Sequence, residues 1–211
     1  MDLAKMTLDN FYTATESDKI NLINANEKDV QCVVVNSIKG NGASHLMMGI
    51  SKKIANGSLL VNYENLISNN GLDEINRLDL NYFKHLFLDS WNGFYLLSDM
   101  NGNYKTSLDM MEEKISSFII NGGKVYMTGT IDNMNERLLS FVSQFSSSFI
   151  QLDKVEKEIL TLLLRDFDSE YKCDFEMKFG KELLDKSYYS YREFQNELIG
   201  IYAKQNLNKD V

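Results

Sequence analysis

The sequence predicts an α/β fold in which a five-stranded parallel sheet is followed by a small helical lid. Short runs rich in β-branched or aromatic residues recur between longer helical patterns, and these runs are apolar on both faces. Such strands, alternating with helices, are typical of a parallel sheet that is covered on both sides. The expected strands are residues 31–36, 58–63, 93–98, 124–130 and 148–152.

Two of the intervening segments have the apolar stripe of an amphipathic helix. Leu46, Ile50 and Ile54 repeat at a spacing of four residues, and a second stripe lies between Thr106 and Ile120. Residues three or four apart lie on one helix face, so we expect both stripes to pack on the sheet.

The strand pattern stops at residue 153. The segments DKVEKEILTLLLRDF, DFEMKFGKELLDKS and SYREFQNELIGIYAKQNL each indicate an amphipathic helix with acidic residues in its first turn. We therefore expect an α/β core over residues 1–152 and a helical lid over residues 153–211.

The composition excludes several classes of protein. The chain has 211 residues and a formal net charge of −8, which disfavours unaided binding to duplex DNA. No apolar run approaches the roughly 18 residues of a membrane span, and the N-terminal residues lack the pattern of a secretory signal, so we expect a cytoplasmic protein. Two cysteines and two histidines offer neither a disulfide framework nor a structural zinc site.

A glycine-containing turn joins the first expected strand to the first expected helix. The phosphate-binding pattern G-x-x-x-x-G-K-[ST] places backbone N–H groups and a helix N-terminus around an anion. In this chain Gly40, Gly42 and Ser44 suit that pattern, whereas Ser37 replaces the first glycine and Ala43 replaces the lysine. Residues 37–44, the candidate phosphate loop, are explained equally well by a plain strand-to-helix turn.

A second candidate is Asp99, which follows the expected strand 93–98. In P-loop ATPases an aspartate at the end of an apolar strand binds magnesium or its water, and an adjacent acid polarises the attacking water. Met100 occupies that adjacent position. The alternative is that Asp99 is a strand-end acid that pairs with Ser44 or with a helix N-terminus.

The order of these parts resembles that of AAA+ ATPases, and in particular the bacterial replication initiator DnaA and its shorter relative Hda. The resemblance covers residues 6 to 203, nearly the whole chain. The matching segments are MTLDNFY, GNGASHLM, YLLSDMN, VYMTGT, SQFSSSFIQL and YREFQNELIGIYA.

The resemblance implies a set of nucleotide-binding positions. The family holds the phosphates with its glycine loop and a lid arginine, and an N-terminal segment packs beside the base. The matching residues are Gly40, Gly42, Ser44 and Arg192 for the phosphates, and Asn10, Phe11 and Tyr12 for the base. Ser44 and Asp99 would hold Mg²⁺ with a bound nucleotide. Arg192 can equally be a surface charge of the lid.

Four departures from the family pattern argue against ATP hydrolysis. Ala43 replaces the loop cation, Met100 the second acid, Thr130 the sensor aspartate, and Gln144 the arginine finger. A finger arginine alone contributes about 10³ to 10⁵ in rate. We therefore expect weak nucleotide binding or none, with ADP favoured over ATP.

The resemblance favours a non-catalytic adaptor in DNA replication initiation or its regulation. The implied partners are a DnaA-like initiator, a sliding clamp or a helicase, and a homo-oligomer is a further assembly that such folds form. MDLAKM contains no clamp-binding peptide, although KMTLDNFY resembles the shape of one. Two alternatives stay open: a divergent ATPase that uses Ser44, Asp99 and Arg192, and a structural subunit that keeps the fold for assembly.

Overall fold

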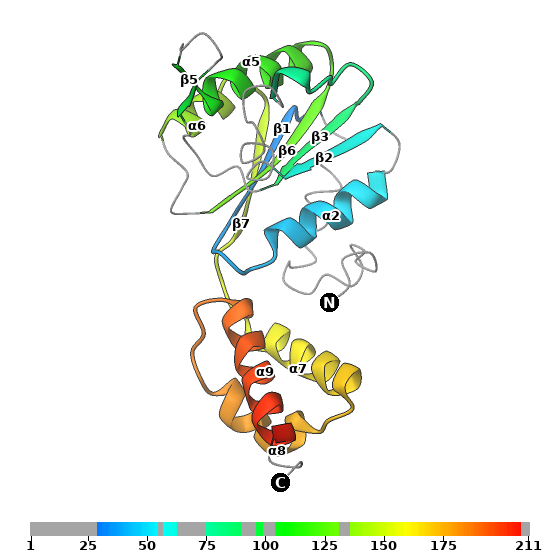
Figure 1. The fold of residues 1–211 in the computed structure, drawn as a ribbon, viewed down its shortest axis with the longest axis vertical. Coiled ribbons are helices and arrows are strands. Elements are labelled where there is room, and N and C mark those ends of the chain that lie inside the picture. The colour runs from blue at the N-terminus through cyan, green and yellow to red at the C-terminus, as the bar shows by residue number, and fades with distance from the viewer. Residues whose placement is uncertain are drawn as a thin grey trace.

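The computed structural model describes residues 29–54, 57–62, 75–89, 96–98, 104–130 and 136–207. In this part of the chain five parallel strands form one sheet, in the order β2-β3-β6-β1-β7 (Figure 1). The strands are β1 Cys32–Ser37, β2 Ser58–Asn62, β3 His85–Asp89, β6 Lys124–Thr130 and β7 Ser147–Leu152. The expected five-stranded parallel sheet is confirmed.

One expected strand lies elsewhere. In chain order, the third strand of the five-stranded sheet is β3. Residues 96–98 instead form β4 (Leu96–Ser98), which pairs antiparallel with β5 (Tyr104–Thr106) in a separate sheet. Both segments are short apolar runs, so composition alone does not separate them. Pairing decides the outcome, because β3 forms ladders with β2 and β6 and buries its three central residues completely.

Helices cover both faces of the sheet. The helices are α2 (Ala43–Ile54), α5 (Ser107–Ile120) and α6 (Glu136–Val142), and the first two agree with the expected stripes. Alternate β1 residues face opposite sides: Val33 and Val35 pack with α2, and Cys32 and Val34 pack with α5 and α6. This alternation explains why β1 has no polar residue until its end.

The lid consists of α7 (Lys157–Tyr171), α8 (Phe175–Leu184) and α9 (Tyr191–Leu207), and β7 leads into it at the bottom of the sheet in Figure 1. Its helices have their own apolar cluster. The buried members are Leu160, Leu164, Phe167, Phe175, Leu183, Tyr191, Phe194 and Leu198. The expected helical lid is therefore present and packs around a separate core.

Side-chain hydrogen bonds cap the N-termini of two lid helices. Ser190 Oγ accepts a hydrogen bond from Glu193 N (3.3 Å), and the Glu193 carboxylate accepts one from Tyr189 N (2.6 Å), as in a capping box that begins α9. The Asp168 carboxylate accepts hydrogen bonds from Phe175 N (2.7 Å) and Glu176 N (2.8 Å), which caps α8.

We expect Asp168→Ala to lower the free energy of unfolding by about 1 to 2 kcal/mol, because two amides at the start of α8 lose their acceptor. Urea unfolding followed by circular dichroism measures the change. Asp166→Ala is the matched control, since Asp166 is an exposed acid on the same helix. Equal losses in the two variants would contradict the capping role.

Candidate functional site

The candidate phosphate loop lies at the carboxyl end of β1 and turns sharply into α2. Gly40 and Gly42 have φ angles of 101° and 87°, which side chains rarely adopt. Asn41 N donates to Ile38 O (3.0 Å), and Leu46 N donates to Gly42 O (2.9 Å) as the helix begins. The loop therefore has the strand, tight turn and helix N-terminus that an anion site requires.

Ala43 and Ser44, the first two residues of α2, differ in exposure. The Ala43 side chain is 9% exposed and belongs to the apolar cluster between α2 and the sheet. Ser44 is exposed, so its hydroxyl is accessible at the helix N-terminus. The loop consequently presents a hydroxyl but has a methyl group at the position of the usual lysine.

The loop is joined to the lid by a buried asparagine. Asn41 is 0% exposed; its Nδ2 donates to Leu152 O (3.0 Å) and its Oδ1 accepts from Tyr191 N (3.3 Å). Tyr191 in turn accepts a hydrogen bond at its hydroxyl from Glu156 N (3.1 Å). One side chain thus connects the end of the sheet, the loop and the first residue of α9.

Gly40 packs against the same end of α9. A Cβ atom added at Gly40 would lie 2.8 Å from Arg192 Cβ and 3.0 Å from Ser190 Oγ. We call Gly40, Asn41, Leu152, Ser190 and Tyr191 the loop–lid junction. Arg192 follows directly and is exposed, so the structure places it beside the candidate phosphate loop.

An acidic residue ends β3, the interior strand that pairs with β6. Asp89 is the last residue of β3, and its Oδ1 accepts a hydrogen bond from Thr128 Oγ1 on β6 (2.8 Å). Both residues continue the face of the sheet that α2 covers, since Phe87 and Tyr126 two residues earlier belong to the α2 cluster. Asp89 therefore occupies the strand-end position that sequence reasoning gave to Asp99.

His45 lies within the electrostatic reach of both charged residues. Burial lowers the pKa of His45, the positive charge of Arg192 lowers it further, and the negative charge of Asp89 partly offsets these effects. The imidazole is therefore mainly neutral at pH 7. His45, Asp89 and Arg192 belong to α2, β3 and α9, so the charges that act on this histidine come from two other elements.

The His45 environment predicts a pH dependence of stability. Its folded pKa lies below the ordinary value of 6.5, so the unfolded chain binds more protons between the two values. Stability therefore rises with pH through this window and falls on acidification. His85 has a lowered pKa for similar reasons and adds a contribution of the same sign.

We expect His45→Gln to reduce the slope of unfolding free energy against pH on the acidic side of the ordinary histidine pKa of 6.5. The His45→Gln/His85→Gln double variant should reduce it further. Urea titrations at several pH values give the slopes. A slope in His45→Gln as steep as that of the wild type would contradict the assignment.

Several residues predicted from the sequence cannot be placed. Asn10, Phe11, Tyr12, Asp99 and Met100 lie outside the described residues. Gln144 is exposed in the turn after α6, where its side chain donates to Ser140 O (3.5 Å), and Thr130 is the last residue of β6. No group of three or more His, Cys, Asp or Glu side chains within the described ranges forms a potential metal site.

Sequence reasoning missed Asn41, Asp89, Thr128 and His45. A signal existed for Asp89, because LFLD at residues 86–89 has the same apolar-run-then-aspartate pattern that pointed to Asp99. The other three had no local signal. Their partners are distant in sequence, with 150 residues between Asn41 and Tyr191.

The parallel sheet in this strand order, the glycine loop after its interior strand β1 and the C-terminal helices are arranged as in solved structures with the AAA+ fold. Domain III of the Thermotoga maritima replication initiation protein DnaA has a similar structure, with a TM-score of 0.69 at 12% identity over 97% of this chain and 90% of that one. The Thermotoga maritima RuvB Holliday junction branch migration motor gives 0.61 at 16% identity, over 91% of this chain.

These similarities concern the fold. The chain spans 62% of the RuvB chain. No protein-family model and no curated sequence matches it. Among the described residues no helix has the length and apolar character that crossing a membrane requires.

Proposed function

We propose that this chain is an AAA+-type adaptor that binds an adenine nucleotide weakly, does not hydrolyse it, and acts through protein partners in DNA replication initiation or its regulation. The loop–lid junction is the observation that carries the proposal. Its Asn41 is completely buried and bonded to the lid, so the state of the candidate phosphate loop is linked to the position of α9.

The chemistry of the loop favours a diphosphate. Backbone N–H groups and the N-terminus of α2 stabilise negative charge without a side-chain cation. The buried methyl group of Ala43 supplies no charge for an outer phosphate, and exposed Arg192 is the cation that the lid brings to this end of the loop. ADP should therefore bind more tightly than ATP.

A magnesium ion would find suitable ligands here. Mg²⁺ prefers oxygen ligands and is usually held by one or two protein groups together with phosphate oxygens. The Ser44 hydroxyl and the Asp89 carboxylate are the described groups of this kind on the α2 side of the sheet. The ion would neutralise phosphate charge, which this chain needs because its loop lacks a lysine.

Nucleotide binding would bias the lid. A phosphate seated on the loop contacts the backbone next to Gly40 and Asn41, and any shift there is passed to Tyr191 through the hydrogen bond at 3.3 Å. A ligand shifts such an equilibrium by its differential affinity for the two arrangements. The arrangement of the lid then depends on whether nucleotide is bound, and a partner protein that contacts the lid can distinguish the two states.

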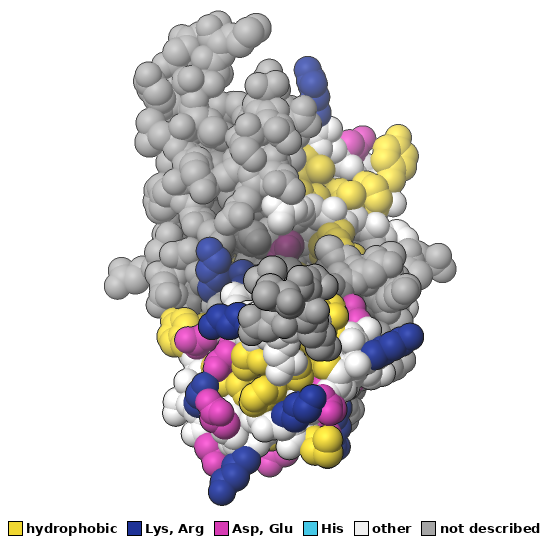
Figure 2. Space-filling view, turned by 60° about the horizontal axis from the view of Figure 1, so that its bottom comes forward, with side chains coloured by type: hydrophobic (Ala, Val, Ile, Leu, Met, Phe, Trp, Pro, Cys, Tyr) yellow, Lys and Arg dark blue, Asp and Glu magenta, His cyan; other side chains and the backbone are white. Residues whose placement is uncertain are grey.

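The charge distribution favours protein partners over duplex DNA. The net charge is −8, and basic and acidic side chains are interspersed over the part of the lid visible in Figure 2. Exposed pairs such as Lys157 with Asp185 (2.9 Å) and Arg165 with Glu176 (2.9 Å) neutralise charge locally. The fold shared with DnaA domain III supports an initiator, clamp or helicase as the partner, or a second copy of this chain.

Titration with fluorescent ADP and ATP, with Mg²⁺ present, tests the proposal. We expect saturable binding, tighter for ADP, and at least about threefold weaker binding in Arg192→Ala, equivalent to the loss of one surface charge contact. Arg165→Ala is the matched control, because Arg165 is an exposed lid arginine paired with Glu176. Absence of binding to either nucleotide would favour a structural subunit.

A divergent ATPase is the second candidate, and Asp89 is the observation that favours it. This acid ends a central strand and is oriented by Thr128. The ATPase reading requires steady phosphate release from ATP that Asp89→Asn abolishes. Release at the level of a protein-free blank, in the wild type and in Asp89→Asn alike, would exclude it.

A further inference from the structure

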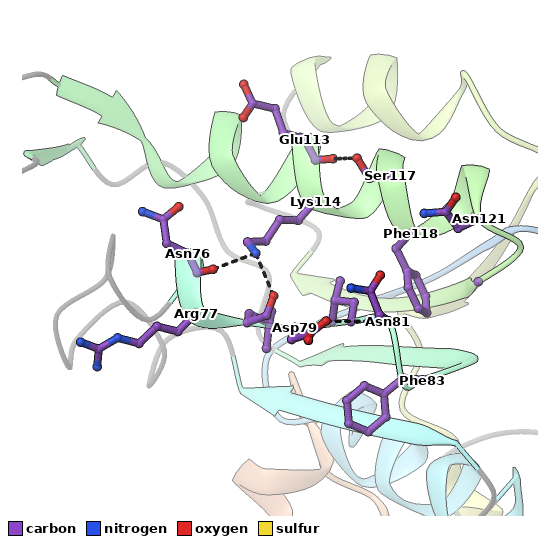
Figure 3. A pocket seen from close by; sticks show the side chains of 13 residues that line it. Asn76, Arg77, Asp79, Asn81, Phe83, Glu113, Lys114, Ser117, Phe118 and Asn121 are labelled. Atoms are coloured by element: carbon purple, nitrogen blue, oxygen red, sulfur yellow. Dashed lines mark hydrogen bonds between the residues drawn. The ribbon is translucent and has the colours of Figure 1, made fainter.

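A cavity of about 660 Å³ lies far from the candidate phosphate loop (Figure 3). It is bounded by residues 76–81 and Phe83, which precede β3, and by the exposed side of α5. Gly123, which precedes β6, also lines it. Because β3 and β6 begin here, the cavity lies at the amino ends of the strands, whereas the candidate phosphate loop follows a carboxyl end. Its size is within the range of about 300 to 1,000 Å³ for ligand sites.

The walls of the cavity are held in place by specific contacts. Lys114 Nζ donates to Asn76 O (3.1 Å) and Leu78 O (2.8 Å), which fastens the segment before β3 to α5. A Cβ atom at Gly123 would clash with the ring of Phe118, so the glycine lets this ring lie over the start of β6. These contacts join the segment before β3 to α5 and place the Phe118 ring beside Gly123.

The lining combines aromatic rings, amides and balanced charge. Leu78, Leu80, Phe83 and Phe118 provide the apolar part. In Figure 3 the side chains of Asn81 and Asn121 lie near Phe118, whereas Asn76 lies on the other side of Lys114. Each primary amide carries both donors and acceptors, as a peptide group does.

Charged side chains of both signs also line the cavity. Arg77 and Lys114 are matched in number by Asp79 and Glu113. A lining without excess charge suits a neutral ligand rather than a phosphate, and the net charge of −8 disfavours nucleic acid.

Two large, exposed apolar side chains belong to residues that are next in sequence to the cavity lining. Tyr82 is 83% exposed and lies between Asn81 and Phe83, and Ile120 is 79% exposed and precedes Asn121. Protein interfaces typically place aromatic and aliphatic anchors around a pocket at their centre. Exposed apolar groups next to lining residues suit a partner protein, which covers more surface than a small solute does.

We propose that this cavity binds an extended peptide segment of a partner protein. One apolar side chain of the segment lies against Phe83 and Phe118, and its main-chain amides bond to the side chains of Asn81 and Asn121. Tyr82 and Ile120 cover the residues on either side. The site is separate from the nucleotide proposal and does not depend on it.

An NMR titration of the full ¹⁵N-labelled chain tests this site. The probe is the capped tripeptide acetyl-Ala-Phe-Ala-amide; acetyl-Ala-Gly-Ala-amide is the control without a ring, and AMP is the probe for a nucleotide ligand. We expect saturable shifts confined to residues 76–83 and 113–123, with a dissociation constant on the order of 1 mM. The glycine peptide and AMP should leave these amides unchanged.

A large side chain that fills the cavity should weaken peptide binding strongly. Ser117→Trp places a large ring in the lining, and we expect at least a roughly tenfold loss of affinity, or about 1.4 kcal/mol. Ser140→Trp is the matched control, since Ser140 is an exposed serine on another helix. If Ser117→Trp does not fold, Tyr82→Ser/Ile120→Ser changes only exposed side chains and should weaken binding about threefold.

Three results of the peptide titration would overturn the proposal. These are an absence of shifts with the phenylalanine peptide, equal binding of the glycine peptide, and AMP shifting the same amides. Unchanged affinity in Ser117→Trp would place the peptide elsewhere and would overturn it equally.

Discussion

Replacing Asn41 with alanine is expected to lower the free energy of unfolding by about 2 to 4 kcal/mol, because a buried donor and a buried acceptor lose their partner together. Tyr191 N and Leu152 O each bond to the Asn41 side chain, which is 0% exposed. The removed amide also leaves a small cavity between the sheet and the lid. Urea unfolding measures the total effect.

The position of the destabilised amides shows whether Asn41 connects the loop to the lid or only stabilises the fold as a buried residue. Amide hydrogen exchange should accelerate at Tyr191 and Arg192 in Asn41→Ala, while the amides of Val33 and Val35 keep most of their protection. Asn121→Ala is the matched control, because Asn121 is exposed at the end of α5. Uniform acceleration through the chain would show that Asn41 stabilises the whole fold without a particular role at the lid.

Gly40→Ala is expected to have the second large effect, about 2 to 4 kcal/mol. A φ of 101° is strained for any side chain, and the new methyl group would lie 2.8 Å from Arg192 Cβ. The lid must then move away from the loop or the loop must change shape. Either outcome should also weaken nucleotide binding, which titration with fluorescent ADP would detect.

Alanine variants at two other glycines separate the cost of backbone strain from the cost of a steric clash. Gly122 has a φ of 86° with open space around its Cβ position, so Gly122→Ala reports strain alone. Gly200 lies within α9, also with open space, and Gly200→Ala should stabilise the chain by up to about 1 kcal/mol. If Gly40→Ala costs no more than Gly122→Ala, the close contact between loop and lid is wrong.

Local patterns in the sequence predicted many of the strands and helices. β1 and β6 are unbroken runs that pair with each other, and the helical stripes of α2 and α5 lie where their spacing indicates. The exception was β3, which is a short apolar run like residues 93–98. A strand is assigned to a sheet by its neighbours, and pairing across long loops has no local signature.

Fewer residues of the candidate site could be predicted from the sequence. Gly40 and Gly42 could be predicted because a tight strand-to-helix turn needs positive φ angles. Asn41 could not, since its role depends on Leu152 and Tyr191, which only the folded chain brings to the loop. Polar side chains act here through tertiary contacts, for which spacing in the sequence gives no information.

The central claim is that nucleotide on the loop changes the lid without being hydrolysed. The most direct measurement is an amide NMR titration with ADP and Mg²⁺, followed by the same titration with ATP while phosphate is assayed in the tube. We predict saturable shifts at Gly40 and Gly42 together with Tyr191 and Arg192, and intact ATP throughout. Shifts confined to the loop, or steady phosphate release that Asp89→Asn abolishes, would contradict the claim.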